Sequence, residues 1–268
     1  MNEHSFIQAI VLGIVEGVTE FLPISSTGHL IIVGDLISFS GMPGNVFEIV
    51  IQLGAILAIC VLYRKRLIDT LLDARHDPGA RNFIGTVLVA IAPAGLLGVV
   101  FSDFITEVLF SPYVVCTSLI LGGIAIIAVE RLHFEPHIME IEKMPMRTAL
   151  KIGFFQSLAL VPGVSRSGAT ILGALFVGVE RKTAAEFSFF LAIPVMLGAS
   201  GIKLLESWEA ISLDQAYIIA AGFIMAFGAA LVVVRWLLNF ISHHGFSVFG
   251  WYRIVFGSAL LIYFLMRA

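Results

Sequence analysis

The sequence predicts an all-α polytopic membrane protein, with about six transmembrane helices and two re-entrant helix-loop-helix hairpins in an inverted-topology repeat. The 268-residue chain is 59% hydrophobic and 13% charged, with a mean hydropathy of +0.99. These values lie far outside the range of soluble domains. Long apolar runs recur without strand-like alternation, so helices and not a barrel are expected to cross the membrane.

The transmembrane spans follow from the apolar runs. Each run is long enough to cross most of a hydrocarbon core about 30 Å thick. The predicted spans are residues 46–62, 83–101, 113–129, 187–205 and 216–234, with a shorter sixth at 251–266.

Two further apolar regions are interrupted by Pro/Gly/Ser loops. The predicted helix 6–21 runs into the sequence EFLPISSTGHL, and the predicted helix 148–161 is followed by PGVSRSGAT. The apolar arm after each loop has about ten residues, so it is roughly 16 Å long and cannot span. Two re-entrant hairpins are therefore expected, and their irregular tips must be buried in protein or line a wet cavity.

The basic residues predict the orientation in the membrane. With this topology, all but three of the 16 lysines and arginines fall on one face, Arg253 among them. The exceptions are Lys203 and Arg267 on the other face and Arg166 in the second loop. The basic face should be cytoplasmic, which puts both termini outside.

The chain is expected to form one integral membrane domain, residues 1–268, built from two repeats. These are about 1–134 and 147–268, with a cytoplasmic connecting loop. An offset of 140 aligns Gly13 with Gly153 and Ser25 with Ser165. Each half has one hairpin and three spans, an odd number, so the second copy is inverted. Inverted repeats with broken helices place their two irregular loops together near the midplane.

Glu16 and Glu20 lie on one face of the first helix, because they are four positions apart. Gly13 and Gly17 share that face and mark it as a packing face, so the carboxylates point into protein. Two buried carboxylates repel each other and require a metal ion, an arginine or a proton. They are candidate metal ligands, and a structural pair hydrogen-bonded to neighbouring helices is the alternative.

His29 follows the first loop, close in sequence to the hydroxyls of Ser25, Ser26 and Thr27. A catalytic base or nucleophile needs such neighbours. The alternative is a buried polar residue with no part in chemistry. Glu48 and Gln52, one turn apart, are expected either to line the cavity or to hydrogen-bond between helices.

The second loop has the composition of an anion site. Arg166 stands between Ser165 and Ser167 at the start of the second arm, with Gly168 and Thr170 in its first turn. A guanidinium fork, three hydroxyls and the free N–H groups of a helix start suit a phosphate. Alternatively, Arg166 forms a structural ion pair with Glu16 or Glu20.

The motifs VEGVTEFLPISSTGHL and PGVSRSGAT resemble the two signatures of the undecaprenyl-diphosphate phosphatase family, membrane enzymes associated with bacitracin resistance. FEIVIQLGAILA and EFSFFLAIP extend the resemblance over nearly the whole chain. It implies hydrolysis of undecaprenyl diphosphate to undecaprenyl phosphate and inorganic phosphate in the bacterial plasma (inner) membrane, which recycles the lipid carrier for peptidoglycan. It also implies a divalent cation, Mg²⁺ or Ca²⁺, and a site that opens to the outer face.

The resemblance also implies roles for single residues. Glu16 and Glu20 match the acidic pair, Ser26 and His29 the catalytic serine and histidine, and Arg166 the phosphate-binding arginine. We expect Ser26 to be the nucleophile with His29 as its general base; attack by His29 itself, or by a water that His29 activates, are the alternatives. The expected substrate contacts are Ser25, Thr27, Ser165, Arg166, Ser167, Gly168 and Thr170.

A transporter or flippase of a phosphorylated lipid carrier is the rival interpretation, since inverted repeats and broken helices are typical of transporters. It does not explain carboxylates, a histidine and hydroxyls gathered around an anion site. The expected partners are a polyprenyl diphosphate lipid and the membrane lipids, and no nucleic acid. A homo-oligomer is compatible with the sequence, which leaves the oligomeric state open.

Overall fold

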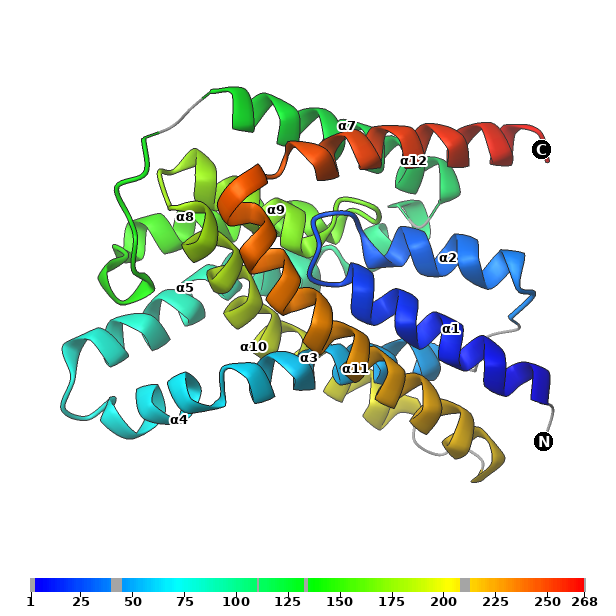
Figure 1. Ribbon diagram of the computed structural model, residues 1–268, viewed down its shortest axis with the longest axis horizontal. Helices are drawn as coiled ribbons and strands as arrows, with labels where there is room; N and C mark the ends of the chain where they lie inside the picture. The colour runs from blue at the N-terminus through cyan, green and yellow to red at the C-terminus, as the bar shows by residue number, and fades with distance from the viewer. Residues whose placement is uncertain (1–2, 40–44, 110, 133–134, 208–212, 268) are drawn as a thin grey trace.

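A computed structural model describes residues 3–39, 45–109, 111–132, 135–207 and 213–267. Within these ranges the chain is helical, and its only β pairing is an isolated bridge between Ile138 and Val179. The predicted all-α fold class is confirmed. Most helices run lengthwise beside one another (Figure 1).

The predicted spans correspond to helices. They are α3 (Val46–Leu62), α5 (Pro78–Val100), α7 (Pro112–Arg131), α10 (Arg181–Ser207), α11 (Leu213–His244) and α12 (Ser247–Leu265). Five of these are long and apolar enough to cross a membrane, and α3 reaches that length only with α4 (Arg64–Asp73), from which it is bent by 70°. The protein is therefore a multi-pass membrane protein. Helix α11 extends ten residues past its predicted end, because hydropathy marks the apolar part of a helix and not its full length.

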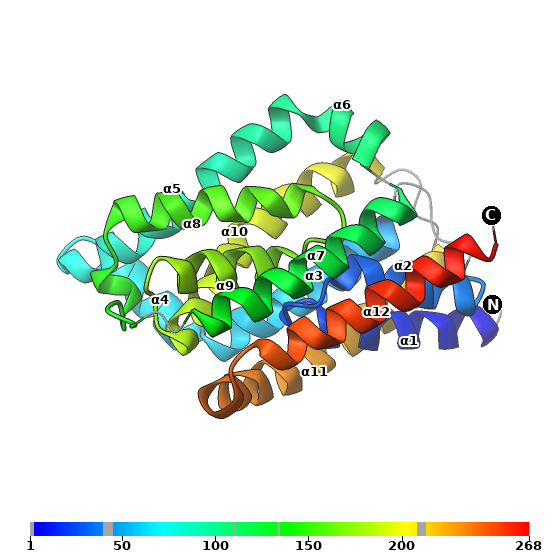
Figure 2. The same ribbon diagram turned by 90° about the horizontal axis from the view of Figure 1, so that it is seen from above.

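Two segments expected to be loops are helical. The polar stretch after α3 forms α4, whose apolar residues Ile68, Leu71 and Leu72 are exposed. The loop after α5 contains α6 (Ser102–Phe104) and the π-helix η2 (Ile105–Leu109), at the edge of the molecule in Figure 2.

Both hairpins are present. The first consists of α1 (Glu3–Thr19) and α2 (Ser26–Leu36), and the second of α8 (Met146–Ser157), the 3₁₀ turn η4 (Leu158–Leu160) and α9 (Arg166–Phe176). The arms α2 and α9 have 11 residues each, as short as predicted. Both tips lie in the middle of the molecule (Figure 1).

Each hairpin packs mainly against a helix from the other half of the chain. Helix α1 lies along α11, and α8 lies along α5. Glycines allow both approaches: a Cβ added at Gly13 would overlap the carbonyl of Gly222, and one at Gly153 would overlap that of Ala90. The predicted packing face of α1 is confirmed, and the repeat itself stays a prediction.

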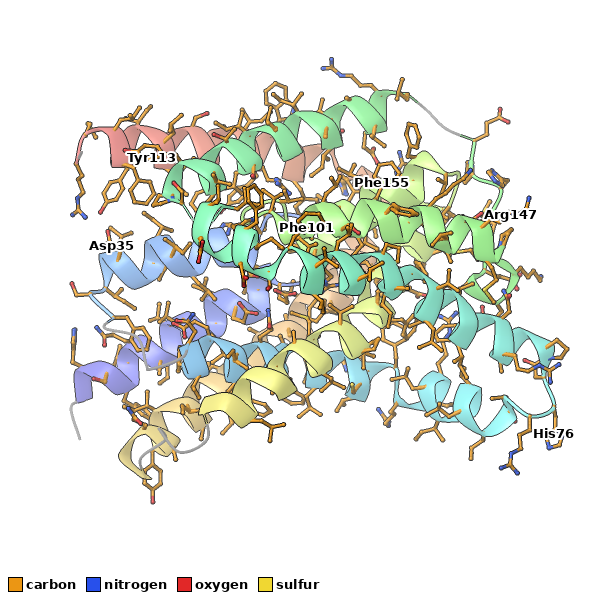
Figure 3. The ribbon with its side chains drawn as sticks, turned by 180° about the vertical axis from the view of Figure 1, so that it is seen from behind. Asp35, His76, Phe101, Tyr113, Arg147 and Phe155 are labelled. Atoms are coloured by element: carbon orange, nitrogen blue, oxygen red, sulfur yellow. The ribbon has the colours of Figure 1, made fainter. Side chains whose placement is uncertain are left out.

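The loops and the chain termini lie at the ends of the molecule on which the predicted topology places them. Figure 3 shows His76 and Arg147 at one end and Asp35 and Tyr113 at the other. Both chain termini lie at the Asp35 end (Figure 1), where Arg267 pairs with Asp35 at 3.0 Å. Which end faces the cytoplasm stays a prediction.

One residue was assigned to the wrong environment. Arg253 was predicted to be among the cytoplasmic charges, but it lies inside α12 and is only 1% exposed. Helix α12 begins at Ser247, a turn before the predicted span, so Arg253 falls in its second turn, where α12 lies beside α7 (Figures 1 and 2).

Candidate active site

The two tips share an unusual backbone. Ser25 has φ 70° and ψ 96°, and Ser165 has φ 73° and ψ 118°. Each residue directly precedes its short arm. Such a conformation costs a non-glycine residue on the order of 1–3 kcal/mol, and such strain tends to occur at functional sites. The two serines that align in sequence therefore play the same part in the backbone.

The tips touch each other, as predicted. Ser167 of the second tip donates a hydrogen bond to the carbonyl of Leu22 in the first, at 2.7 Å. Arg166 donates through Nη2 to Oε1 of Glu20 at 3.1 Å. The predicted alternative of an Arg166–Glu20 ion pair is thus present, and it joins the two hairpins.

Glu20 connects the candidate nucleophile with the candidate phosphate-binding residue. Its Oε2 accepts a hydrogen bond from Ser26 Oγ at 2.5 Å, while its Oε1 accepts from Arg166. Glu20 is 5% exposed and Ser26 is 9% exposed. A carboxylate at this distance is in position to accept the serine proton.

His29 does not pair with Ser26 in this structure, and its role as the general base for that serine stays a prediction. Its Nδ1 lies 2.8 Å from the carbonyl of Ser25, and its Nε2 lies 2.7 Å from the hydroxyl of Tyr252. A carbonyl only accepts, so we assign the ring proton to Nδ1, and Nε2 then accepts from Tyr252. The ring also stacks on Phe256, with centroids 4.3 Å apart. His29 therefore faces α12.

Arg166 is held from α10 as well. Its Nη1 donates to the carbonyl of Ser188 at 2.6 Å and contacts the Ser188 hydroxyl at 3.3 Å. Its Nε is buried and has no hydrogen-bond acceptor in the described part of the chain. Leaving a buried donor unpaired is costly, and more so when it is charged. This nitrogen lacks an acceptor such as a phosphoryl oxygen.

Glu16 has buried acceptors without a donor, whereas Arg166 has a buried donor without an acceptor. It is 1% exposed, and neither carboxylate oxygen has a donor among the described residues. It lies against Glu20 and near Glu48, whose Oε2 is also buried and unpaired. Like-charged groups in such a place call for a cation.

These oxygens fit the hard divalent cation that the sequence predicts. Within the described ranges, no three His, Cys, Asp or Glu side chains are grouped to hold a metal by themselves. Mg²⁺ is commonly held by one or two carboxylates together with substrate phosphates and water. The residues therefore fit a cation that binds together with a phosphorylated substrate.

Adjoining cavities contain these groups. One of about 250 Å³ is lined by Glu20, Ser26, Thr27, Ser165 and Arg166, among others. A second of about 430 Å³ shares Ser26, Thr27 and Gln52 with it and adds Glu16, Glu48 and Ser200. A third of about 180 Å³ shares Leu30 and Ile31 with the second and reaches Asp35. The cavities thus lead from the tips toward the end that carries the termini.

Three predicted substrate contacts lie behind the cavity wall. Ser167 and Thr170 are fully buried, and Thr170 donates to the carbonyl of Arg166 at 2.8 Å. Gly168 is buried, and its N–H donates to Ser165 Oγ, which caps α9. The polar groups of these three residues form hydrogen bonds within the tip and between the tips, and their direct contact with a substrate stays a prediction. Ser25, Thr27, Ser165 and Arg166 do line the smaller cavity.

Sequence reasoning missed Tyr252, Ser188 and Ser200. Tyr252 and Ser188 contact the site from α12 and α10, and Ser200 has a buried hydroxyl without a partner among the described atoms. Single hydroxyls in apolar spans are common, so no local pattern distinguishes them. Only the packing of distant helices brings them to the tips.

Comparisons with known proteins cover the whole site. Residues 9–259 match the family described as bacitracin resistance protein BacA. The chain is 72% identical over 264 residues to an undecaprenyl-diphosphatase of Parvibaculum lavamentivorans, covering 98% of each protein. It is 50% identical over 264 residues to undecaprenyl-diphosphatase 2 of Paramagnetospirillum magneticum, covering 97% of this chain and 100% of that protein. It is 48% identical over 263 residues to undecaprenyl-diphosphatase 1 of Mesorhizobium japonicum, covering 98% of each.

Proposed function

Because the chain belongs to the bacitracin resistance protein family BacA, we propose that its function is the hydrolysis of undecaprenyl diphosphate to undecaprenyl phosphate and inorganic phosphate. The relatives named undecaprenyl-diphosphatase match it over nearly their full length. The protein is thus a phosphatase of the membrane, and it contributes to bacitracin resistance by regenerating the lipid carrier.

One observation carries the proposal at the level of the site. The cavities bring together a buried cation with an unsatisfied donor, Arg166 Nε, and a buried carboxylate with two unsatisfied oxygens, Glu16. A diphosphate with its divalent cation supplies the missing partner of each: phosphoryl oxygens for Arg166 and the metal ion for Glu16. A neutral lipid headgroup would satisfy neither.

Ser26 is the nucleophile in this proposal. Its oxygen attacks the terminal phosphorus, and its proton passes to Glu20, 2.5 Å away. The bond from that phosphorus to the bridging oxygen breaks, and undecaprenyl phosphate departs with the proton. Water then cleaves the phosphoserine: Glu20 accepts a proton from the water and returns it to the serine oxygen.

Arg166, at the N-terminus of α9, holds the phosphoryl oxygens and offsets their charge as the bond breaks. A bound Mg²⁺ or Ca²⁺ would neutralise the diphosphate and polarise its phosphoryl group. Glu16 and Glu20 are the proposed ligands. Both oxygens of Glu20 already have partners in Ser26 and Arg166, so Glu16 is the stronger ligand of the two.

His29 remains an alternative nucleophile, and activation of a water by His29 is a third route. Either route requires its Nε2 to leave the hydroxyl of Tyr252. The observed geometry supports Ser26 because only Ser26 both lines the cavities and has a carboxylate in contact. A phosphoenzyme trapped by acid quench and mapped by mass spectrometry to Ser26 or to His29 distinguishes these routes.

The site opens, in this proposal, to the outer face of the inner membrane, where both termini also lie. The series of cavities supports this, since it leads toward Asp35 and the termini. The apolar side chains of Leu30, Ile31 and Ile49 on the middle cavity suit the first units of a prenyl tail.

The test is phosphate release from a long-chain prenyl diphosphate by purified protein in detergent, where no transport can occur. We expect release that a chelator abolishes, with large losses for Glu20→Ala, Ser26→Ala and Arg166→Ala. A loss of the same size for His29→Ala would favour the two routes through His29. Arg267→Ala, at an exposed arginine far from the tips, is the control. No phosphate release by the wild-type protein, or normal turnover by Arg166→Ala, would overturn the proposal.

A further inference from the structure

A second buried arginine, Arg253, lies between the two tips without lining the cavities. It is 1% exposed, and no carboxylate in the described ranges pairs with it. A guanidinium carries five N–H hydrogens, and here it has five carbonyl acceptors. They are Leu119 at 3.2 Å from Nε, Pro23 at 3.2 Å and Val164 at 2.8 Å from Nη1, and Ser118 at 3.0 Å and Gly163 at 3.1 Å from Nη2.

These carbonyls come from three separate segments. Pro23 belongs to the first tip, two residues before Ser25, and Val164 belongs to the second, two residues before Arg166. The remaining acceptors include Ser118 and Leu119 of α7. One planar group therefore joins both tips to the helix pair α7 and α12, and the Nη1 atom alone joins the two tips to each other.

We propose that Arg253 is the positioning residue of the active site: its guanidinium sets the separation of the two hairpin tips, and so holds Arg166 in register with Ser26. The proposal rests on the proposed function, because the register matters only if both tips act on one substrate. Arg253 does not touch the substrate. It acts through the backbone of the tips.

The space and the hydrogen-bond acceptors around Arg253 match the shape and the donors of a guanidinium group. A Cβ added at Gly122 of α7 would overlap Nη2, and one at Gly168 would lie 3.0 Å from Nη1. Lysine has three donors on one atom and cannot reach carbonyls on opposite sides of a planar fork. Because all five acceptors are neutral, the positive charge is not cancelled, and it favours an anion at the tips.

The first test is Arg253→Lys, which keeps the charge and removes the fork. Full-length protein that elutes as one peak with unchanged helical circular dichroism is assayed for release of phosphate from prenyl diphosphate. Misplacement of reacting groups by about 1 Å costs roughly 100-fold. We expect kcat/KM to fall about 100-fold, with Arg267→Lys unchanged. A folded Arg253→Lys with normal kcat/KM overturns the proposal.

A double-mutant cycle separates positioning from a general loss of folded enzyme. If Arg253 acts by positioning Arg166, then Arg253→Lys should lower kcat/KM much less in the Arg166→Lys background than in the wild-type protein. The double variant Arg166→Lys, Arg253→Lys should then lose far less than the product of the two single losses. If Arg253→Lys only reduced the fraction of folded enzyme, its fold-loss in activity would be the same in either background. A double variant whose loss equals the product of the two single losses therefore contradicts the proposal.

Gly122→Ala tests the same contact without changing Arg253, in case Arg253→Lys does not fold. The added methyl group displaces Nη2 from its carbonyls, and we expect kcat/KM to fall about 10-fold or more. Gly95→Ala is the matched control, since a Cβ there meets nothing within 4 Å. Equal activity of the two alanine variants overturns the proposal.

Failure of the inference is distinguishable from failure of the proposed function. If the wild-type protein releases no phosphate from prenyl diphosphate, the function is wrong whatever Arg253 does. If the wild type is active and the Arg253 and Gly122 variants match it, the function stands and Arg253 has no positioning role.

Discussion

Ser26 and Glu20 form a hydrogen bond of 2.5 Å across the first tip, with the serine on the short arm and the carboxylate just beyond α1. Because the other oxygen of Glu20 contacts Arg166, this carboxylate links the proposed nucleophile to the proposed phosphate-binding residue. Chemistry at Ser26 is therefore expected to depend on Glu20 more directly than on His29.

Glu20→Gln should remove the proton acceptor while keeping the size of the side chain. We expect kcat for phosphate release to fall by about 100- to 10,000-fold, the usual range for a general base. Since Ser26 and Glu20 act as a unit, Ser26→Ala should add little in the Glu20→Gln background. Near wild-type turnover by Glu20→Gln would show that the proton goes elsewhere.

Tyr252→Phe should disturb His29 while keeping the ring that stacks beside it. Loss of the hydroxyl leaves Nε2 without its 2.7 Å partner. One such hydrogen bond contributes about 1 kcal/mol to stability, so we expect a lower thermal unfolding midpoint in detergent. The value of kcat/KM should stay near that of the wild type, because the route through Ser26 does not use this bond and the routes through His29 require it to break. Tyr263→Phe is the matched control on the same helix, because its hydroxyl bonds Asp35 at the surface. Equal unfolding midpoints for both variants would show that the Tyr252 hydroxyl does not stabilise the position of His29.

Glu16→Gln should weaken the cation site without changing the volume of the side chain. Both oxygens of Glu16 are buried and unpaired, so the neutral amide should stabilise the apo protein while it lowers metal affinity. We expect half-maximal activity to require at least about tenfold more Mg²⁺. The shift in thermal unfolding midpoint on adding Mg²⁺ with pyrophosphate measures binding without turnover, and it should shrink. An unchanged metal requirement would remove Glu16 from the site.

Gly13→Ala should destabilise the protein through the contact of α1 with α11. Its Cβ would overlap the backbone of Gly222, and such overpacking costs about 1–3 kcal/mol. A lower thermal unfolding midpoint in detergent is expected. Gly228→Ala in α11 is the matched control: a Cβ there meets nothing within 4 Å, so the midpoint should be retained or raised. Identical midpoints would contradict the close packing of these helices.

Much of the fold could be predicted from the sequence because the membrane imposes a length on every crossing. Apolar runs of sufficient length identified the spans, and the arms α2 and α9 were too short to cross. The glycines of α1 identified its packing face. The amphipathic helix α4 was not predicted, because a hydropathy profile identifies long apolar runs and α4 is too polar to form one.

The chemistry of the site could be predicted in kind, since intramembrane carboxylates, a histidine and an arginine are costly unless they act together. Which atoms meet could not be predicted. His29 lies 223 positions from Tyr252, and Arg253 lies 230 positions from Pro23. Neither contact can therefore be inferred from a short sequence motif. A hydrogen bond requires alignment within tenths of an ångström, and only the packing of α12 against α7 and the tips provides it. Apolar length and residue composition were enough to predict the spans, the two hairpins and a phosphorylated ligand. The contact of Glu20 with Ser26 and the bridge that Arg253 forms between the tips depend on the packing of helices that are distant in the sequence.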